Sequence, residues 1–185
     1  RPAFPNGVRV DRIDDEFLDL LVASRCEFIS FAIESGSPEM QRRIKKNIDL
    51  EAARRAIEGA ARRGLYTNGF FMLGFPGETL SEMLQTVRYS LSVPLTQALF
   101  FNVLAMPGTE LYESIPPERR GDFRAADYLV ADVNLSAEPD AVLAAVHRLA
   151  YVAFYWRPRT AWRLARSLGG LRRVSDLGFR LAHVL

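Results

Sequence analysis

The sequence lacks the residues on which several classes of protein depend. Its 185 residues include one cysteine, Cys26. A disulfide framework within the chain is therefore excluded, and so is a metal cluster held by cysteines of this chain alone. No apolar run approaches the roughly 18 residues that a membrane span needs. The sequence shows no signal peptide, and we expect a cytoplasmic protein.

A strong net charge is also missing. The formal net charge is +2, which is too close to zero to indicate a nucleic-acid partner. The charge is unevenly distributed, because residues 141–185 contain eight Arg and one Asp. This basic part has two interpretations. It is a solvated helical face that packs on the rest of the protein, which we favour, or an amphipathic surface for weak contact with a membrane.

An initiator Met is absent, since the chain begins Arg1-Pro2. We therefore expect an excised or processed piece of a longer protein. What is present is ordinary for a globular domain. Apolar residues make up 49% and charged residues 25% of a chain long enough to form one core.

Apolar runs alternate with helical patterns as far as Tyr112. Strands are expected at residues 7–11, 28–33, 66–73 and 98–104. Repeated strand–helix units predict an α/β fold with parallel strands and right-handed crossovers. The near-continuous apolar run at 28–33 suits a strand covered on both faces. Four strands cannot close an eight-stranded barrel, so the sheet is either small and open or part of a larger barrel.

Short signals mark where the helices begin and which faces they bury. Ser37 before Pro38, Asp49, and Thr79 three residues before Glu82 are helix starts. Apolar positions predict buried faces. The predicted inward residues are Phe17, Leu18, Leu20 and Leu21; Leu80, Met83, Leu84, Val87 and Leu91; and Val142, Ala145, Val146, Leu149 and Val152. Two basic amphipathic helices are expected at 156–167 and 171–183.

Polar or glycine-containing turns follow three of the expected strands. They are Glu34-Ser-Gly-Ser37, Gly74-Phe-Pro-Gly-Glu78 and Met106-Pro-Gly-Thr109. Because the carboxyl ends of parallel strands meet at one edge, these turns form one rim of a pocket.

The residue types at this rim suit a nucleoside ligand. A strand-end carboxylate such as Glu34 can accept both hydroxyls of a ribose, and Lys46 can pair with a ligand carboxylate. Met72 and the backbone near Leu104 can contact a base. Taken singly, the same residues fit a plainer interpretation, in which Glu34 caps the next helix and Lys46 is solvated.

The order of these motifs resembles the radical S-adenosylmethionine (SAM) superfamily. The resemblance is closest to the subgroup whose members often carry an N-terminal cobalamin-binding domain. It covers about residues 7–113 and rests on Phe-Ala-Ile-Glu-Ser-Gly-Ser, Ile-Lys-Lys-Asn, Gly-Phe-Phe-Met-Leu-Gly-Phe-Pro-Gly-Glu-Thr and Pro-Gly-Thr-Glu-Leu-Tyr. It implies a partial parallel (β/α) barrel of the TIM type, of which this chain holds the third to sixth strands. Residues 1–114 would be the barrel portion, 115–137 a linker and 138–185 a basic C-terminal helical extension.

The resemblance also implies a SAM site. By it, Glu34 holds the ribose and Lys46 holds the methionyl carboxylate. Met72 and Gly74 line the adenine, with the Leu104 backbone beside it, and Ser35 and Ser37 border the same pocket. The implied cofactors are SAM, a 4Fe-4S cluster and, in the cobalamin-dependent members, cobalamin.

One departure from the family is large, because its cluster motif Cys-x-x-x-Cys-x-x-Cys is absent. We therefore expect no metal ligand in this chain, a buried apolar Cys26, and cluster ligands that lie upstream. The chain would be the C-terminal portion of an enzyme that generates a 5′-deoxyadenosyl radical, or methylates if it depends on cobalamin. Alone it is expected to be inactive. Its substrate, a small molecule or one of unknown class, and its catalytic residues are not predicted.

Two alternatives remain open. The chain could be a non-catalytic α/β scaffold or interaction fragment that lacks the cluster half. A weaker alternative is an unrelated barrel enzyme that binds phosphate at the same glycine turns.

Overall fold

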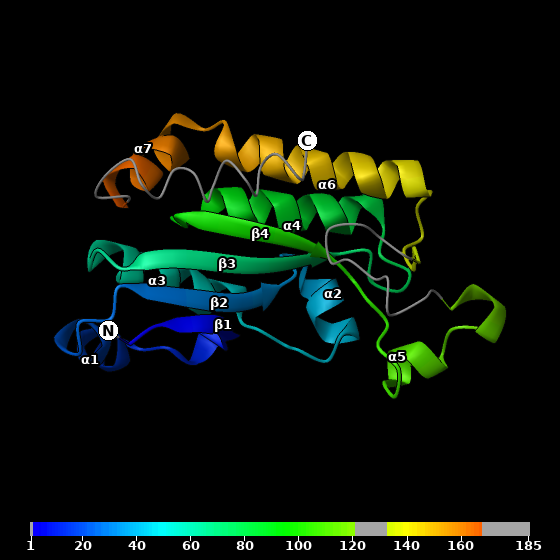
Figure 1. Cartoon of the computed structure of the whole chain (residues 1–185), viewed down its shortest axis with the longest axis horizontal. Coiled ribbons are helices and arrows are strands. Elements are labelled where there is room, and N and C mark those ends of the chain that lie inside the picture. The colour runs from blue at the N-terminus through cyan, green and yellow to red at the C-terminus, as the bar shows by residue number, and fades with distance from the viewer. Residues whose placement is uncertain (1, 121–132, 168–185) are drawn as a thin grey trace.

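A parallel four-stranded sheet in the order β1-β2-β3-β4 forms the centre of the fold (Figure 1). The structure is a computed structural model that describes residues 2–120 and 133–167. The strands are β1 (Phe4–Val8), β2 (Phe28–Glu34), β3 (Tyr66–Leu73) and β4 (Gln97–Asn102), and each neighbouring pair is parallel. The predicted α/β architecture is confirmed, and the sheet does not close into a barrel within the described residues.

Helices connect the strands and follow the last one. They are α1 (Asp15–Ala23), α2 (Pro38–Arg43), α3 (Leu50–Arg62), α4 (Leu80–Ser92), α5 (Glu110–Glu113), α6 (Asp140–Tyr155) and α7 (Pro158–Ser167), with 3-10 turns η1 (Val10–Arg12) and η2 (Pro117–Arg119). The predicted helix starts are confirmed. Ser37 caps α2 and Asp49 caps α3, while Thr79 and Glu82 form a capping box on α4.

The first strand differs from the prediction of residues 7–11. It begins at Phe4 and ends at Val8, and the chain then turns into η1. The turn occurs because Val10, with 0% of its surface exposed, enters the core. Asp11 lies in this turn, and its carboxylate accepts hydrogen bonds from the Arg9 guanidinium and from the backbone N–H of Asp49 at the start of α3.

The helical layer lies on one face of the sheet in the described part of the chain (Figure 1). On that face Phe31, Phe71 and Phe100 are fully buried and share one core with helix residues such as Ile57 and Met83. The other face carries partly exposed side chains, which include Phe28, Phe70, Met72, Leu99 and Phe101. Cover on both faces of β2 was expected, but the described helices cover one.

Two predicted helix faces need correction at one residue each. Leu20 of α1 is 61% exposed and Leu80 of α4 is 38% exposed. Both lie beside correctly predicted neighbours, since Leu21 and Met83 are buried. The apolar arc of each helix is wider than the strip that contacts the sheet, so its margin faces solvent.

Helix α6 packs against the same core as the sheet and covers the outer edge of β4. The hydroxyl of Tyr151 accepts from the Phe100 N–H and donates to the Phe100 carbonyl, each at 3.1 Å. The carbonyl of Phe100 also lies 2.8 Å from Nε2 of His147. The hydroxyl of Tyr155 donates to the Ala98 carbonyl at 2.9 Å. Side chains thereby supply hydrogen bonds that a further strand would otherwise make.

The predicted inward face of α6 is wrong at three of its five residues. Val146 is buried and Val142 packs against the core, but Leu149 and Val152 are 47% and 39% exposed and Ala145 is exposed. The buried residues are Leu143, Val146, His147, Ala150, Tyr151 and Phe154. The helix turns this side inward because the β4 edge needs hydrogen-bond partners, and aromatic side chains with polar tips bury apolar area while supplying them.

The C-terminal region is described only to Ser167. Helix α7 agrees with the first expected basic helix, whereas the helix expected at 171–183 lies outside the described residues. Because α6 shares the sheet's core, the boundary between barrel and extension stays a prediction. None of the helices in the described part is both long and apolar enough to cross a membrane.

Candidate functional site

Glu34 and Lys46, two of the predicted site residues, form an ion pair at the carboxyl edge of the sheet. Nζ of Lys46 lies 2.6 Å from Oε1 of Glu34, and their side chains are 31% and 18% exposed. Glu34 is the last residue of β2, and Lys46 lies in the loop between α2 and α3. The structure therefore places a carboxylate and an ammonium together where both remain accessible to a ligand.

The backbone around this pair adopts left-handed conformations. The φ angle is 68° at Glu34, 56° at Lys45 and 49° at Asn47. Residues other than glycine rarely adopt such angles, and they persist where surrounding contacts fix them. Arg9 supplies such contacts, because its guanidinium donates to the carbonyls of Lys46 at 2.9 Å and Asn47 at 3.2 Å. Arg9 belongs to no sequence motif and was not predicted as a site residue.

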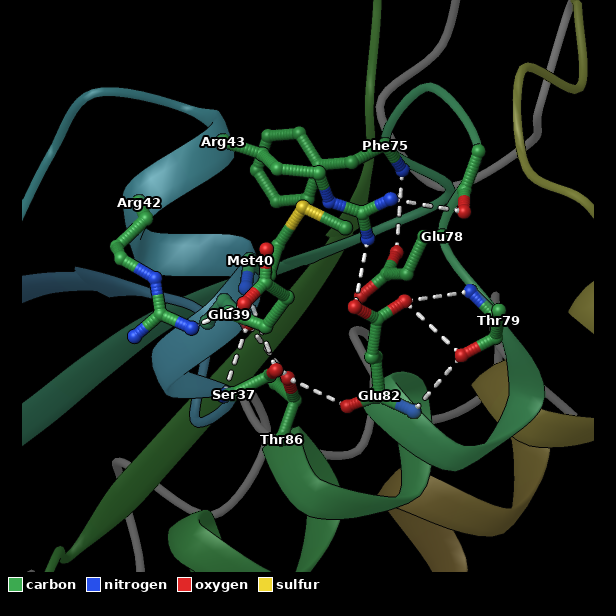
Figure 2. A network of polar contacts seen from close by, with 12 residues as sticks. Ser37, Glu39, Met40, Arg42, Arg43, Phe75, Glu78, Thr79, Glu82 and Thr86 are labelled. Carbon is green, nitrogen blue, oxygen red and sulfur yellow. Dashed lines mark hydrogen bonds and ion pairs between the residues drawn. The ribbon is translucent and has the colours of Figure 1, made fainter.

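The Ser-Gly-Ser turn after Glu34 packs against α4. The hydroxyl of Ser35 lies 3.0 Å from that of Thr86, which also accepts from the Gly36 N–H at 3.0 Å. Ser37 caps α2 by accepting from the Met40 N–H (Figure 2). Both serines are fully buried. Their hydroxyls are thus engaged within the protein, and their contact with a ligand stays a prediction.

The turn after β3 is built around a buried carboxylate. Oε2 of Glu78 accepts from the N–H groups of Gly74 at 2.7 Å and Phe75 at 3.1 Å (Figure 2). Gly74 has a φ of 87°, and a Cβ there would meet Leu143 of α6 at 3.3 Å. The bare side of Gly74 therefore faces α6, while its predicted backbone contact with adenine stays untested.

Burial changes the acidity of Glu78, whose side chain is 0% exposed. Loss of solvent raises the pKa of this carboxyl to about 7, against the opposing effect of the two backbone hydrogen bonds. The sequence shows Glu78 only as part of the Gly-Phe-Pro-Gly-Glu turn. The motif does not predict that Glu78 is buried, because it does not indicate whether the side chain points into the protein or toward solvent.

An ion pair between Arg43 and Glu82 links this turn to α2. Nη2 of Arg43 lies 2.7 Å from Oε1 of Glu82, and Nη1 donates to the Gly77 carbonyl at 3.1 Å (Figure 2). Glu82 also accepts from Thr79. The Gly77 N–H in turn donates to the Leu135 carbonyl. Contacts from α2 and from the segment before α6 therefore both fix the glycine turn.

A small apolar cluster lies at the same end of the sheet. It comprises buried Met40, Phe75 and Val103, against which Met72 and Leu111 pack. Leu104 follows β4 and is partly exposed. Met72 and Leu104 thus lie near the carboxyl ends of β3 and β4, where they were predicted, and Met72 remains partly exposed as a contact for a base requires.

The donor set fits SAM in part and does not fit an iron–sulfur cluster. The accessible carboxylate of Glu34 and ammonium of Lys46 suit hydroxyl and carboxylate groups of a ligand. Among residues 2–120 and 133–167, no group of three or more His, Cys, Asp or Glu could hold a metal ion. Cys26 is 5% exposed and precedes β2, so it lies at the opposite edge from Glu34.

The sequence is similar to proteins named as methyltransferases. Residues 4–90 match the model of the radical SAM superfamily. A cytidylyl-2-hydroxyethylphosphonate methyltransferase of Streptomyces wedmorensis is 34% identical over 116 residues, which are 59% of this chain and 22% of that protein. An uncharacterized methyltransferase of Pyrococcus horikoshii is 27% identical over 178 residues, which are 90% of this chain and 39% of that protein. The chain thus spans a minor part of these relatives.

Solved structures share the fold. Coproporphyrinogen III oxidase of Escherichia coli, a radical SAM enzyme, superposes with a TM-score of 0.60 at 18% identity over 81% of this chain and 31% of that one. The radical SAM methyltransferase TsrM of Kitasatospora setae, determined with cobalamin and a [4Fe-4S] cluster, gives a TM-score of 0.54 at 21% identity over 73% and 28% of the two chains. The match to the radical SAM superfamily thus covers residues 4–90, and the two solved structures show a shared fold.

Proposed function

We propose that this chain supplies much of the SAM-binding surface of a radical SAM enzyme. The observation that carries the proposal is the accessible Glu34–Lys46 pair at the carboxyl edge of the sheet. Ligands of parallel α/β folds bind at this edge. The family match over residues 4–90 adds that SAM is the ligand to expect.

Each member of the pair would have a separate role. The carboxylate of Glu34 would accept hydrogen bonds from the ribose hydroxyls, and the ammonium of Lys46 would bind the methionyl carboxylate. Without ligand the two groups neutralise each other, so neither is left as an uncompensated, partly buried charge. A zwitterionic ligand would exchange this one ion pair for two sets of contacts.

The remaining predicted residues would shape the pocket. Met72 and the Leu104 backbone would contact the adenine, and Gly74 would present backbone beside it. Ser35 and Ser37 would act from behind by fixing the turn that follows Glu34. SAM bound beside a 4Fe-4S cluster would supply the 5′-deoxyadenosyl radical. The cluster ligands would come from outside this chain, which has one cysteine.

Methyl transfer is the reaction that the named relatives favour. Two relatives are named as methyltransferases, and one structural neighbour was determined with cobalamin. We propose a cytoplasmic methyltransferase or related radical enzyme acting on a substrate that this chain does not identify. A scaffold lacking SAM affinity is the competing proposal, and binding measurements separate the two.

The test is calorimetric titration of SAM into the full-length enzyme, with and without its cluster. Glu34→Gln and Lys46→Met should each weaken binding by about tenfold or more, because each removes a charged hydrogen-bonding partner. Glu39→Gln and Lys45→Ala are matched controls, since both side chains are exposed and pair with Arg42 and Glu110 respectively. If the four variants bind SAM equally well, the site assignment is wrong; if the wild type does not bind SAM, the scaffold proposal stands.

A further inference from the structure

Gln41 of α2 is a buried glutamine whose amide binds on both sides of Glu34. Its side chain is 2% exposed. Nε2 donates to the carbonyls of Ile33 and Ser35, each at 2.7 Å. Both hydrogens of the amide are therefore directed at the residues that flank Glu34 in sequence. This contact fixes the peptide units before and after the Glu34 side chain.

The same residue also holds the loop that carries Lys46. The Gln41 carbonyl accepts from the N–H groups of Lys46 and Asn47, each at 3.1 Å. Oε1 of its side chain accepts from the Ile48 N–H at 3.3 Å. One residue thus joins the end of β2 to the loop between α2 and α3, and the Glu34–Lys46 ion pair also links these two segments.

Both segments need an external restraint. Glu34, Lys45 and Asn47 all have left-handed backbone conformations, which side chains other than glycine adopt only where neighbouring structure enforces them. Arg9 restrains the loop from the β1 side through the carbonyls of Lys46 and Asn47. The Gln41 side chain contacts both segments, through the carbonyls of Ile33 and Ser35 on one and the Ile48 N–H on the other, so it helps to set how they are placed relative to each other.

We propose that Gln41 is a positioning residue for SAM binding, which holds the Glu34 carboxylate and the Lys46 ammonium at the separation that the ligand requires. The inference rests on the proposed function of that pair. It acts through the backbone and not by contact with the ligand, because its polar atoms are all engaged within the protein. A neutral amide fits this environment because it supplies two hydrogen-bond donors and one acceptor. A carboxylate could not donate, and it would be repelled by the carbonyl oxygens of Ile33 and Ser35.

A double-mutant cycle in SAM affinity tests the proposal. The full-length enzyme, cluster-free and cluster-loaded, is titrated with SAM as wild type, Gln41→Leu, Glu34→Gln and the double variant. Gln41→Leu should weaken binding by about tenfold. In the Glu34→Gln background, Gln41→Leu should weaken SAM binding by less than a further factor of about three, because the carboxylate that Gln41 positions is already absent. Additive losses in the cycle would overturn the proposal.

Gln97→Leu is the matched control for general destabilisation. Gln97 is also buried and loses one side-chain hydrogen bond, from the Tyr66 hydroxyl, but it lies at the first residue of β4, away from the carboxyl edge. Both variants should lower the melting temperature, and only Gln41→Leu should lower SAM affinity. If Gln41→Leu changes the melting temperature alone, its role is structural and the proposal fails.

A second variant covers the case in which Gln41→Leu does not fold. Arg9→Gln removes contacts to the Lys46 loop from a side chain that is 43% exposed, so it should be tolerated and should weaken SAM binding by about threefold. Unchanged affinity in folded Arg9→Gln would overturn the view that the loop needs restraint. If Glu34→Gln itself leaves SAM affinity unchanged, the proposed function fails and this inference fails with it; a loss in Glu34→Gln without one in Gln41→Leu rejects the inference alone.

Discussion

The carboxylate of Glu78 accepts the backbone N–H of Gly74 at 2.7 Å, and it does so with no exposed surface. Its second oxygen, Oε1, has no hydrogen-bond partner in the described structure. Burial of this kind favours the protonated form, which accounts for the pKa of about 7. The glycine turn at the proposed SAM site is therefore built on a carboxyl group that titrates near neutral pH.

The stability of the protein should fall as the pH rises from about 4.5 to about 7 because of Glu78. In this interval the unfolded carboxyl is ionised while the folded one still holds its proton, so ionisation favours the unfolded state. The contribution is about 3 kcal/mol at most, from a shift of this size. Glu78→Gln should flatten the dependence in urea unfolding between these pH values. An unchanged slope would contradict the raised pKa.

His147 should produce the opposite dependence. Burial lowers the pKa of this imidazole below its ordinary value of 6.5, although its hydrogen bond to the Phe100 carbonyl opposes the shift. The unfolded state then binds a proton more readily, so stability is complete above pH 6.5 and decreases as the pH falls below it. His147→Gln should remove this decrease in the same unfolding series, and Arg148→Gln on the exposed side of α6 should not.

Gly36→Ala should destabilise the protein because α4 leaves no room for a side chain. A Cβ at Gly36 would lie 2.5 Å from Cβ of Tyr89 and 2.9 Å from the Gln85 carbonyl oxygen. The expected loss is about 1–3 kcal/mol, as for an overpacked core, and SAM affinity should fall with it because the Ser-Gly-Ser turn follows Glu34. Gly64→Ala is the comparison, since nothing lies within 4 Å there and only its φ of 77° opposes a side chain. Loss of affinity in both variants would point to general unfolding.

The outer side of α6 carries an exposed apolar stripe, which is defined by Leu149, Val152 and the 84% exposed Trp156. Arg148 lies on the same side of the helix. As the less favoured of the two interpretations of the basic C-terminal part, we propose a weak contact of this stripe with anionic membrane surfaces. Trp156→Ser should reduce co-sedimentation with vesicles rich in anionic phospholipid by about twofold, whereas Leu20→Ser, at an exposed apolar site on α1, should not. Absence of lipid-dependent pelleting in the wild type would reject the contact.

The sequence predicted the features that depend on neighbours in the chain. The caps at Ser37, Asp49 and Thr79 were predictable because a hydroxyl or carboxylate satisfies N–H groups two or three residues away. The parallel order followed from alternating strands and helices. Proximity of Glu34 to Lys46 was implied by a family resemblance, and the ion pair itself was not foreseen.

Features that depend on distant residues escaped prediction. The inward side of α6 is set by the backbone of β4, roughly 50 residues earlier in the chain, and not by the apolar period of the helix itself. Arg9 and Gln41 look like ordinary polar residues in the sequence. Their partners are backbone carbonyls, which every residue has, so no residue pattern reveals them.

The side chains that α6 lays along β4 also limit how copies of this protein can associate. A strand of another molecule cannot join β4 at Ala98 and Phe100 without displacing Tyr151, Tyr155 and His147. The α6 side chains therefore close this part of the β4 edge to edge-to-edge pairing with another molecule.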